Sequence, residues 1–337
     1  MNPKRLLREE TKTNKTKDFD WRQRNLVLYN TAVGSQRGHA SAGGNSVFKW
    51  KILLIALLIS SSCGVAQERR VNPTWLHRYV PALSNSGDLS SAACKYKPIF
   101  GEGDASSNSL PSVARFGEET LDHQGACAPV QYQRQEEIYF VLGGSGVFQY
   151  GDRTYPIRKN DFTYIPPAIK HSLTNNSNVR LQVLIMSFKI KPSIAIGQPS
   201  LEPKLVNLDS VKEQPVEGHP MSVLYKLLVG PKSGKRDSID DAYVVTSLFW
   251  MDFAPGGTNF PHHHETAEEI YLVLDGEGTI VAGGGMDGIE GRHAARAGDA
   301  YYFRQNCTVG FYNQNKPGAK AHILAVRSWV PLPKEED

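Results

Sequence analysis

From about residue 113 to residue 330 the chain consists of short apolar runs, separated by Gly, Pro, Asn and Asp. Several of these runs alternate apolar and polar residues, a period of two that is typical of β-strands with one buried face. No convincing amphipathic helical pattern interrupts them. Short strands bounded by turn residues predict an all-β sandwich or barrel.

A segment of eleven residues occurs twice. Residues 136–146 (EEIYFVLGGSG) and 268–278 (EEIYLVLDGEG) are identical at eight positions, and each is followed by a second hairpin and a similar turn. The repeat predicts two copies of one small β-barrel. The second copy is six residues longer, in the Gly-rich loop 283–291, which is either a lid over a ligand or a tolerated insertion.

Three residues of the second copy have the chemistry of a metal site: His262, His264 and Glu269. The two histidines are two residues apart, so on a strand their side chains point to the same face, while His263 points to the other. Glu269 begins the next strand of the hairpin, which brings its carboxylate beside them. Two imidazoles and one carboxylate suit Fe(II), Mn(II), Ni(II), Co(II) or Zn(II), and we predict one divalent ion here.

Residues 256–276 have the spacing Gly-x5-His-x-His-x4-Glu-x6-Gly, which resembles the first motif of the cupin superfamily. That superfamily has a second motif, Gly-x5-Pro-x-Gly-x2-His-x3-Asn. The resemblance covers about residues 113–330. It implies two double-stranded β-helix (jelly-roll) barrels in tandem, a bicupin, with the site inside a barrel.

The second copy departs from the second motif, where Pro, Gly and His are replaced by Arg304, Asn306 and Val309. Val309 stands where the resemblance places a fourth ligand, so the second copy keeps a three-ligand set. His322, on the presumed last strand, or Cys307 could compensate, although neither is at a family position. Arg304 is a candidate contact for an anionic substrate at the barrel mouth.

The first copy departs from the first motif instead. Glu137 and His171 remain at ligand positions, but Val130 and Tyr132 replace the two histidines of the first motif. One histidine and one carboxylate are too few to retain a metal, so we predict a degenerate site. Glu137 and His171 are expected to form a hydrogen-bonded structural pair inside the first barrel, with Val130 and Tyr132 as packing.

The N-terminal region has a different composition. Residues 52–59 (ILLIALLI) follow two lysines and precede small residues, which together predict a secretory signal over 47–66. Eight apolar residues are too few to span a bilayer, which needs about 20. A lipoprotein signal using Cys63 is less favoured, and a short uncut anchor is a third reading. Residues 1–46 are an unstructured extension or an over-extended gene start.

Charge and cysteine content narrow the functional classes. Residues 1–51 contain 11 Lys and Arg against 4 Asp and Glu, so the net charge of +4 for the whole chain leaves −3 for the rest. Nucleic-acid binding is therefore not expected. Export permits a disulfide, for which Cys94 and Cys127 are the only pair we consider, while Cys307 is expected to be a buried apolar residue.

The predicted organisation is an N-terminal arm over 67–112, a first cupin domain over 113–195, an interdomain segment over 196–240 and a second cupin domain over 241–330. Two functional hypotheses follow. The second barrel is a metal-dependent enzyme of dioxygenase, isomerase or hydrolase type acting on a small polar molecule, since three protein ligands leave coordination positions open. Alternatively, it is a storage or ligand-sensing protein with a vestigial site. Under either hypothesis the protein is expected to be secreted or periplasmic. A homo-oligomer is compatible with either.

Overall fold

The computed structural model describes residues 73–284 and 290–330. The predicted signal segment 47–66, the extension 1–46 and the centre of loop 283–291 lie outside these residues. Within them almost all of the regular secondary structure is β-strand, which confirms the all-β prediction. The helical turns described are three short 3-10 segments: η1 (Val80–Ala82), η2 (Ser107–Ser109) and η3 (Leu208–Ser210). None of the described residues form a helix long and apolar enough to cross a bilayer.

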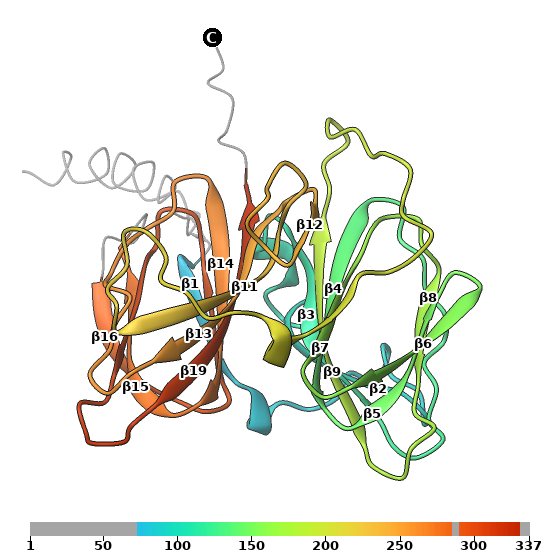
Figure 1. Cartoon of the computed structure of the whole chain (residues 1–337), viewed down its shortest axis with the longest axis horizontal. Coiled ribbons are helices and arrows are strands. Elements are labelled where there is room, and N and C mark those ends of the chain that lie inside the picture. The colour runs from blue at the N-terminus through green and yellow to red at the C-terminus, as the bar shows by residue number, and fades with distance from the viewer. Residues whose placement is uncertain (1–72, 285–289, 331–337) are drawn as a thin grey trace, which may run out of the picture. The chain divides into compact units, whose positions relative to one another are not determined.

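The first barrel consists of two sheets (Figure 1). Its larger sheet has, in spatial order, β10 (Leu205–Asn207), β7 (Asp161–Ile165), β4 (Gln135–Gly143), β9 (Leu181–Lys189), β3 (Val113–Leu121) and β2 (Lys95–Gly101). The smaller sheet has β6 (Arg153–Arg158), β5 (Ser145–Tyr150) and β8 (His171–Thr174).

The second barrel repeats this plan. Its larger sheet has, in order, β1 (Trp75–Tyr79), β17 (Asp299–Phe303), β14 (Ala267–Asp275), β19 (Ala321–Trp329), β13 (Val245–Phe253), β11 (Val223–Pro231) and β12 (Ile239–Ala242). The smaller sheet has β16 (Glu290–Arg296), β15 (Glu277–Gly283) and β18 (Thr308–Asn313). Two jelly-roll barrels in tandem are thus confirmed.

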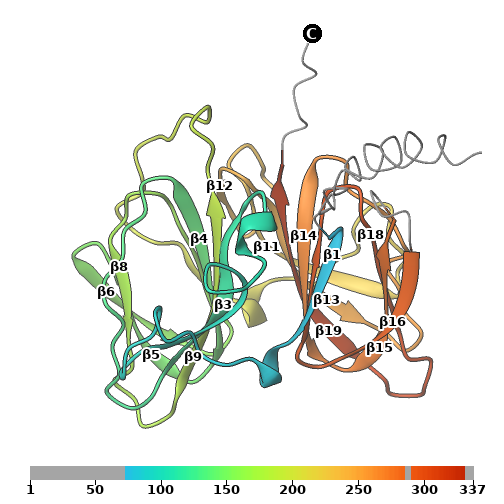
Figure 2. The same ribbon diagram turned by 180° about the vertical axis from the view of Figure 1, so that it is seen from behind.

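The two barrels exchange edge strands. Strand β1, from the predicted arm, pairs with β17 of the second barrel, and β10, from the predicted interdomain segment, pairs with β7 of the first. Figures 1 and 2 show β1, in blue, among the orange and red strands of the second barrel. The arm also contains β2, and the interdomain segment contains β11. Both segments therefore supply strands to the barrels, in addition to connecting them.

Side chains alternate between two cores along the central strands. On β14, Tyr271 and Val273 point into the second barrel, whereas Ile270 and Leu272 belong to a different apolar cluster. That cluster also contains Ile138 and Phe140 of β4, so it lies between the large sheets of the two barrels. Alternation with a period of two assigns each strand residue to one core or the other.

Glu136, the first glutamate of the repeat, points toward this interface. Its carboxylate is buried and accepts hydrogen bonds at 2.6–2.9 Å from the backbone N–H groups of Tyr243, Val244 and Val245, which belong to the second barrel, and from the Tyr164 hydroxyl. Burial raises the pKa of Glu136, and these four donors oppose the rise.

Glu268 makes the reciprocal contact. From the second barrel its carboxylate accepts hydrogen bonds from the backbone N–H groups of Ser112 (2.9 Å) and Val113 (3.0 Å), and from the Tyr302 hydroxyl at 2.7 Å. In each barrel, consecutive glutamates therefore point to opposite faces of one strand. The first satisfies backbone groups of the other barrel, and the second points into its own barrel.

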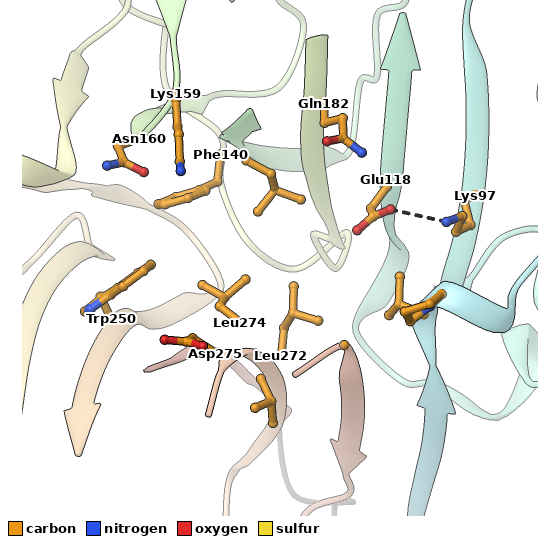
Figure 3. A pocket seen from close by; sticks show the side chains of 15 residues that line it. Lys97, Glu118, Phe140, Lys159, Asn160, Gln182, Trp250, Leu272, Leu274 and Asp275 are labelled. Atoms are coloured by element: carbon orange, nitrogen blue, oxygen red, sulfur yellow. Dashed lines mark ion pairs between the residues drawn. The ribbon is translucent and has the colours of Figure 1, made fainter. Parts of the chain in front are cut away.

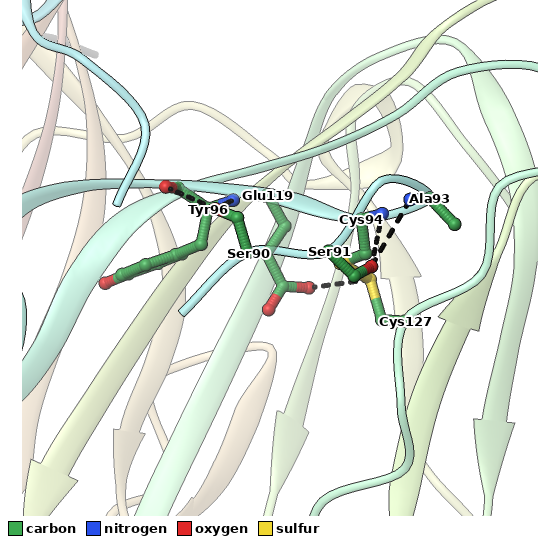
Figure 4. Close-up of a disulfide and its surroundings, with 7 residues drawn as sticks. All are labelled: Ser90, Ser91, Ala93, Cys94, Tyr96, Glu119 and Cys127. Atoms are coloured by element: carbon green, nitrogen blue, oxygen red, sulfur yellow. Dashed lines mark hydrogen bonds between the residues drawn. A yellow bond between two sulfur atoms is a disulfide. The ribbon is translucent and has the colours of Figure 1, made fainter. Parts of the chain in front are cut away.

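A disulfide joins Cys94 and Cys127 (Figure 4). It connects the start of β2 to the loop after β3, and the backbone N–H of Cys94 is also bonded to the Ser91 hydroxyl at 3.0 Å. This is the pair expected from the sequence. The half-buried Glu119 carboxylate lies beside it, and burial raises the pKa of that carboxyl to about 7. Two sulfurs bonded to each other are not thiolate ligands, so this group is not a metal site in its oxidised form.

Candidate metal centre

The structure brings His262, His264 and Glu269 together. Glu269 lies near the start of β14, is only 4 % exposed and points into the barrel, while the histidines come from the segment between β13 and β14. Their ligand atoms all lie within 4.8 Å of one another. Nε2 of His264 is 3.1 Å from a Glu269 oxygen. This arrangement, two imidazole nitrogens and a carboxylate oxygen, suits a divalent transition metal.

The backbone holds His262 in place. Its N–H and C=O pair with Val309 of β18 at 2.9 and 2.8 Å, and its Nδ1 is 2.8 Å from the Phe260 carbonyl oxygen. Histidines that bind metal usually donate their second N–H to such a carbonyl, which fixes the tautomer and leaves the other nitrogen for the metal. His262 is therefore oriented to present Nε2, and the residues present fit a metal ion.

A cation that the sequence analysis did not single out lies at the site. Nη1 of Arg327, on β19, is 3.3 Å from both ring nitrogens of His264, and its Nη2 donates to the Ser247 hydroxyl at 2.8 Å. Burial alone raises the pKa of Glu269, but His264, Arg327 and His262 together hold it below its ordinary value. The carboxylate is thus kept ionised, as a ligand must be.

Two further side chains lie close to the site. His219, in the turn before β11, has its ring centroid 5.4 Å from that of His262. Burial, followed by the charge of His262, lowers the pKa of His219. Tyr225, on β11, is 1 % exposed, and its buried hydroxyl has no hydrogen-bond partner among the described residues. The charge of Glu269 contributes to the raised pKa of that hydroxyl, so the two groups lie within electrostatic reach of each other.

The structure places the remaining candidates elsewhere. His322 lies on the opposite face of β19 from Arg327, between Asp252 and Asp275 at 3.5 Å from each, with its ring 5.2 Å from that of Trp250. It is therefore not grouped with the three ligands.

Trp250 and Asp275 line a groove of about 500 Å³ between the barrels (Figure 3). Arg304 lies just beyond the end of β17, where its charge acts on Tyr302, a residue of the core between the barrels. Cys307 is 1 % exposed within the apolar interior of the second barrel.

In the first barrel the corresponding position is closed by an ion cluster. Nε2 of His171 lies 2.7 Å from one Glu137 oxygen, and Nη2 of Arg115 lies 2.6 Å from the other. His171 and Glu137 are almost completely buried, and the Arg115 guanidinium lies 4.6 Å from the centre of the half-buried Tyr132 ring. Val130 pairs with the backbone of His171. The expected pair is therefore part of a triad in which arginine neutralises the carboxylate.

The two arginines come from different strands. In the first barrel Arg115 of β3 lies opposite Ser187 of β9, and in the second barrel Ser247 of β13 lies opposite Arg327 of β19. Each barrel thus has one Arg–Ser pair. The arginine is on the earlier of the two paired strands in the first barrel and on the later one in the second. A signal for Arg327 was present in the sequence, because it continues the inward-facing alternation of Ala321, Ile323 and Ala325.

Comparisons with known proteins agree with this geometry. Residues 117–187 and 249–326 match the family described as Cupin domain. Among solved structures, the chain is similar to the protein Ylba from E. coli, at 13 % identity and a TM-score of 0.58, with 78 % of this chain and 94 % of that one covered.

Two other solved structures are similar over a comparable share of the chain. An oxalate decarboxylase from Lactobacillus farciminis, solved as a formate complex, has 11 % identity, a TM-score of 0.55 and coverage of 76 % and 86 %. Vicilin from Corylus avellana (hazelnut) has 10 % identity, a TM-score of 0.53 and coverage of 77 % and 86 %.

A curated relative matches a shorter stretch. An uncharacterized protein from Methanocaldococcus jannaschii is 31 % identical over 77 residues, which is 23 % of this chain and 56 % of the relative. The chain thus spans about half the length of that relative. The two domain matches, together with the two barrels that contain them, identify the chain as a member of the cupin superfamily with two cupin domains in tandem, a bicupin.

Proposed function

We propose that the second barrel is the site of a metal-dependent enzyme acting on a small anionic molecule, in an exported protein. The observation that carries the proposal is the position of Arg327 beside His264 and Glu269. In the first barrel Glu137 neutralises Arg115 directly, at 2.6 Å. In the second barrel, the side-chain hydrogen bonds of Arg327 within the described residues are to His264, Ser247 and Thr246, and the charge of Glu269 acts on it without a direct ion pair. A substrate carboxylate would supply the direct ion pair that Glu137 provides in the first barrel.

A divalent metal bound by His262, His264 and Glu269 would act as a Lewis acid or bind oxygen at its open positions. The chain's own groups would orient the substrate. Arg327 is placed to pair with a carboxylate, and the unpartnered Tyr225 hydroxyl is available to donate a hydrogen bond to a substrate oxygen. The reaction types that we propose remain dioxygenation, isomerisation and hydrolysis.

Oxalate is the first compound to test, because one of the similar structures is named as an oxalate decarboxylase. Arg327→Ala is expected to weaken oxalate binding by the metal-loaded protein about 10- to 150-fold, which corresponds to the loss of one hydrogen bond to a charged group. Isothermal titration measures this, with Arg304→Ala as the contrasting variant. Equal binding by wild type and Arg327→Ala, with oxalate or with other small carboxylic acids, would show that Arg327 is not an anion site.

A binding protein without turnover is the second candidate. The apolar Val309 at the position of a fourth ligand favours it, and vicilin shows that the tandem fold is not confined to proteins named as enzymes. Oxygen consumption and product formation by the metal-loaded protein decide between the two candidates. Tight carboxylate binding with no conversion would favour the second.

Export is supported by the composition of residues 47–66, in which a basic flank, an apolar run and small residues follow one another. The mature protein is then expected to begin near Gln67, and N-terminal sequencing of protein from the native host measures this. Recovery of the full chain from Met1 in the cytoplasm would contradict export.

A further inference from the structure

His219 stands in nearly the same relation to His262 as His264 does. The ring centroids of His219 and His262 are 5.4 Å apart with the planes at 78°, and those of His262 and His264 are 4.9 Å apart at 77°. Rings at this separation are close enough for each to place one nitrogen on the same ion, since Zn–N bonds are about 2.0–2.1 Å long. His219 comes from the segment between the barrels and belongs to neither cupin motif.

The anchoring of the His219 ring is also like that of His262. Nδ1 of His219 is 3.2 Å from the carbonyl oxygen of Asn259, and Nδ1 of His262 is 2.8 Å from that of Phe260. Asn259 is itself fixed, since its side chain donates to the Tyr271 hydroxyl and accepts from the Phe311 N–H, each at 2.8 Å. Consecutive carbonyls thus lie within hydrogen-bond distance of Nδ1 of both rings and leave both Nε2 atoms available.

The side chain next to His219 has an unsatisfied polar group. The ring of Tyr225 is 5.3 Å from that of His219, and its buried hydroxyl has no hydrogen-bond partner among the described residues. Buried polar groups are almost always paired, so a group bound at the metal site would satisfy a hydroxyl that is otherwise left without a partner. By contrast, Val309, at the position of the fourth cupin ligand, offers no donor atom.

We propose that His219 is a fourth ligand of the metal ion, supplied by the segment between the barrels in place of a residue at Val309. The proposal rests on the metal site proposed above. In the present structure His219 lies outside the group whose ligand atoms are within 4.8 Å of one another, so it would approach the other three on metal binding. His219 is half-buried and lies in a turn next to Gly218, not within a strand.

Four variants of the full chain test the proposal, with Zn(II) alone as the probe. His219→Ala removes the imidazole, and His219→Phe keeps a ring of similar shape against Tyr225 and His262 but removes the nitrogens. Both are expected to weaken Zn(II) binding about 10- to 100-fold relative to wild type. The exposed His263→Ala is the matched control and should bind as wild type does, whereas His262→Ala should lose the metal.

X-ray absorption of the Zn(II)-loaded proteins counts the coordinated imidazoles. The spectrum should show three in wild type and in His263→Ala, and two in both His219 variants; a purely structural role of His219 would not change this count. If the His219 variants keep wild-type affinity and spectrum while His262→Ala loses the metal, His219 is not a ligand and the three-ligand site stands. If His262→Ala also keeps the metal, the proposed metal site itself is wrong.

Discussion

Replacing any one of the three second-barrel ligands is expected to abolish stoichiometric metal binding at micromolar concentrations. His262→Ala, His264→Ala and Glu269→Ala should each lower the affinity by more than about 100-fold, since the loss of an outer partner alone typically costs 10- to 100-fold. The reason is that the remaining ligands cannot offset the hydration that the ion gives up. Competition with a chromogenic chelator, using Zn(II) or Co(II), measures the affinities.

Two controls make this result specific. His263→Ala removes an exposed neighbouring imidazole and should leave the affinity unchanged. His171→Ala removes the buried imidazole of the first barrel and should also leave it unchanged, although this variant is expected to be less stable. Full metal binding by both His264→Ala and Glu269→Ala would mean that the ion binds elsewhere.

The second large effect concerns stability. Arg115→Ala should lower the free energy of unfolding by roughly 3–5 kcal/mol, the usual result of removing one partner from a buried ion pair. Glu137 would then be a buried carboxylate with only His171 beside it, while the pKa of Glu137 is now held below its ordinary value by His171 and Arg115 against the effect of burial. Urea denaturation measures the change.

The matched variant is the double substitution Arg115→Met with Glu137→Leu, which replaces both charges by apolar groups of similar size. It should recover much of the lost stability, because no buried charge is left unpaired. Metal content should be unchanged in both proteins. A loss below about 1 kcal/mol for Arg115→Ala, or a loss of metal from the folded variant, would contradict a purely structural role for the first-barrel cluster.

Much of the fold could be predicted from local pattern. Turn residues between short apolar runs indicated strands, and the repeat beginning at Glu136 and Glu268 indicated two copies of one barrel. The spacing of His262, His264 and Glu269 indicated that they lie close together, because a hairpin with a period of two leaves few other arrangements. The structure groups these three residues as expected, and metal binding stays a prediction.

The remainder depends on pairing between distant segments, which local pattern does not encode. Strands β1 and β10 are short, and nothing in their sequences specifies that β1 joins the second barrel and β10 the first. His219 was missed for the same reason, since it lies in a segment interpreted as a connection. His322 was considered as a ligand without regard to the face of the strand on which it lies. Ala321 and Ile323, on either side of it, point into the barrel, so the side chain of His322 lies on the opposite face of the strand.

The role of the first glutamate of each repeat was also hidden from the sequence. A charged residue within an otherwise apolar strand signals a constraint, but its partners are backbone groups of the other barrel. Glu136 contacts the 243–245 segment, and Glu268 contacts Ser112 and Val113. Only the three-dimensional arrangement shows that one glutamate in each pair connects the barrels while the next one lines a barrel interior.

The metal-to-chain ratio tests most directly whether a single site exists in the second barrel. Protein purified without a histidine tag, loaded with excess Zn(II) and freed of unbound ion, is expected to contain one metal per chain by elemental analysis. The His264→Ala protein treated in the same way should contain none. Two ions per wild-type chain, or one ion per chain that persists in His264→Ala, would contradict a metal centre built on His262, His264 and Glu269.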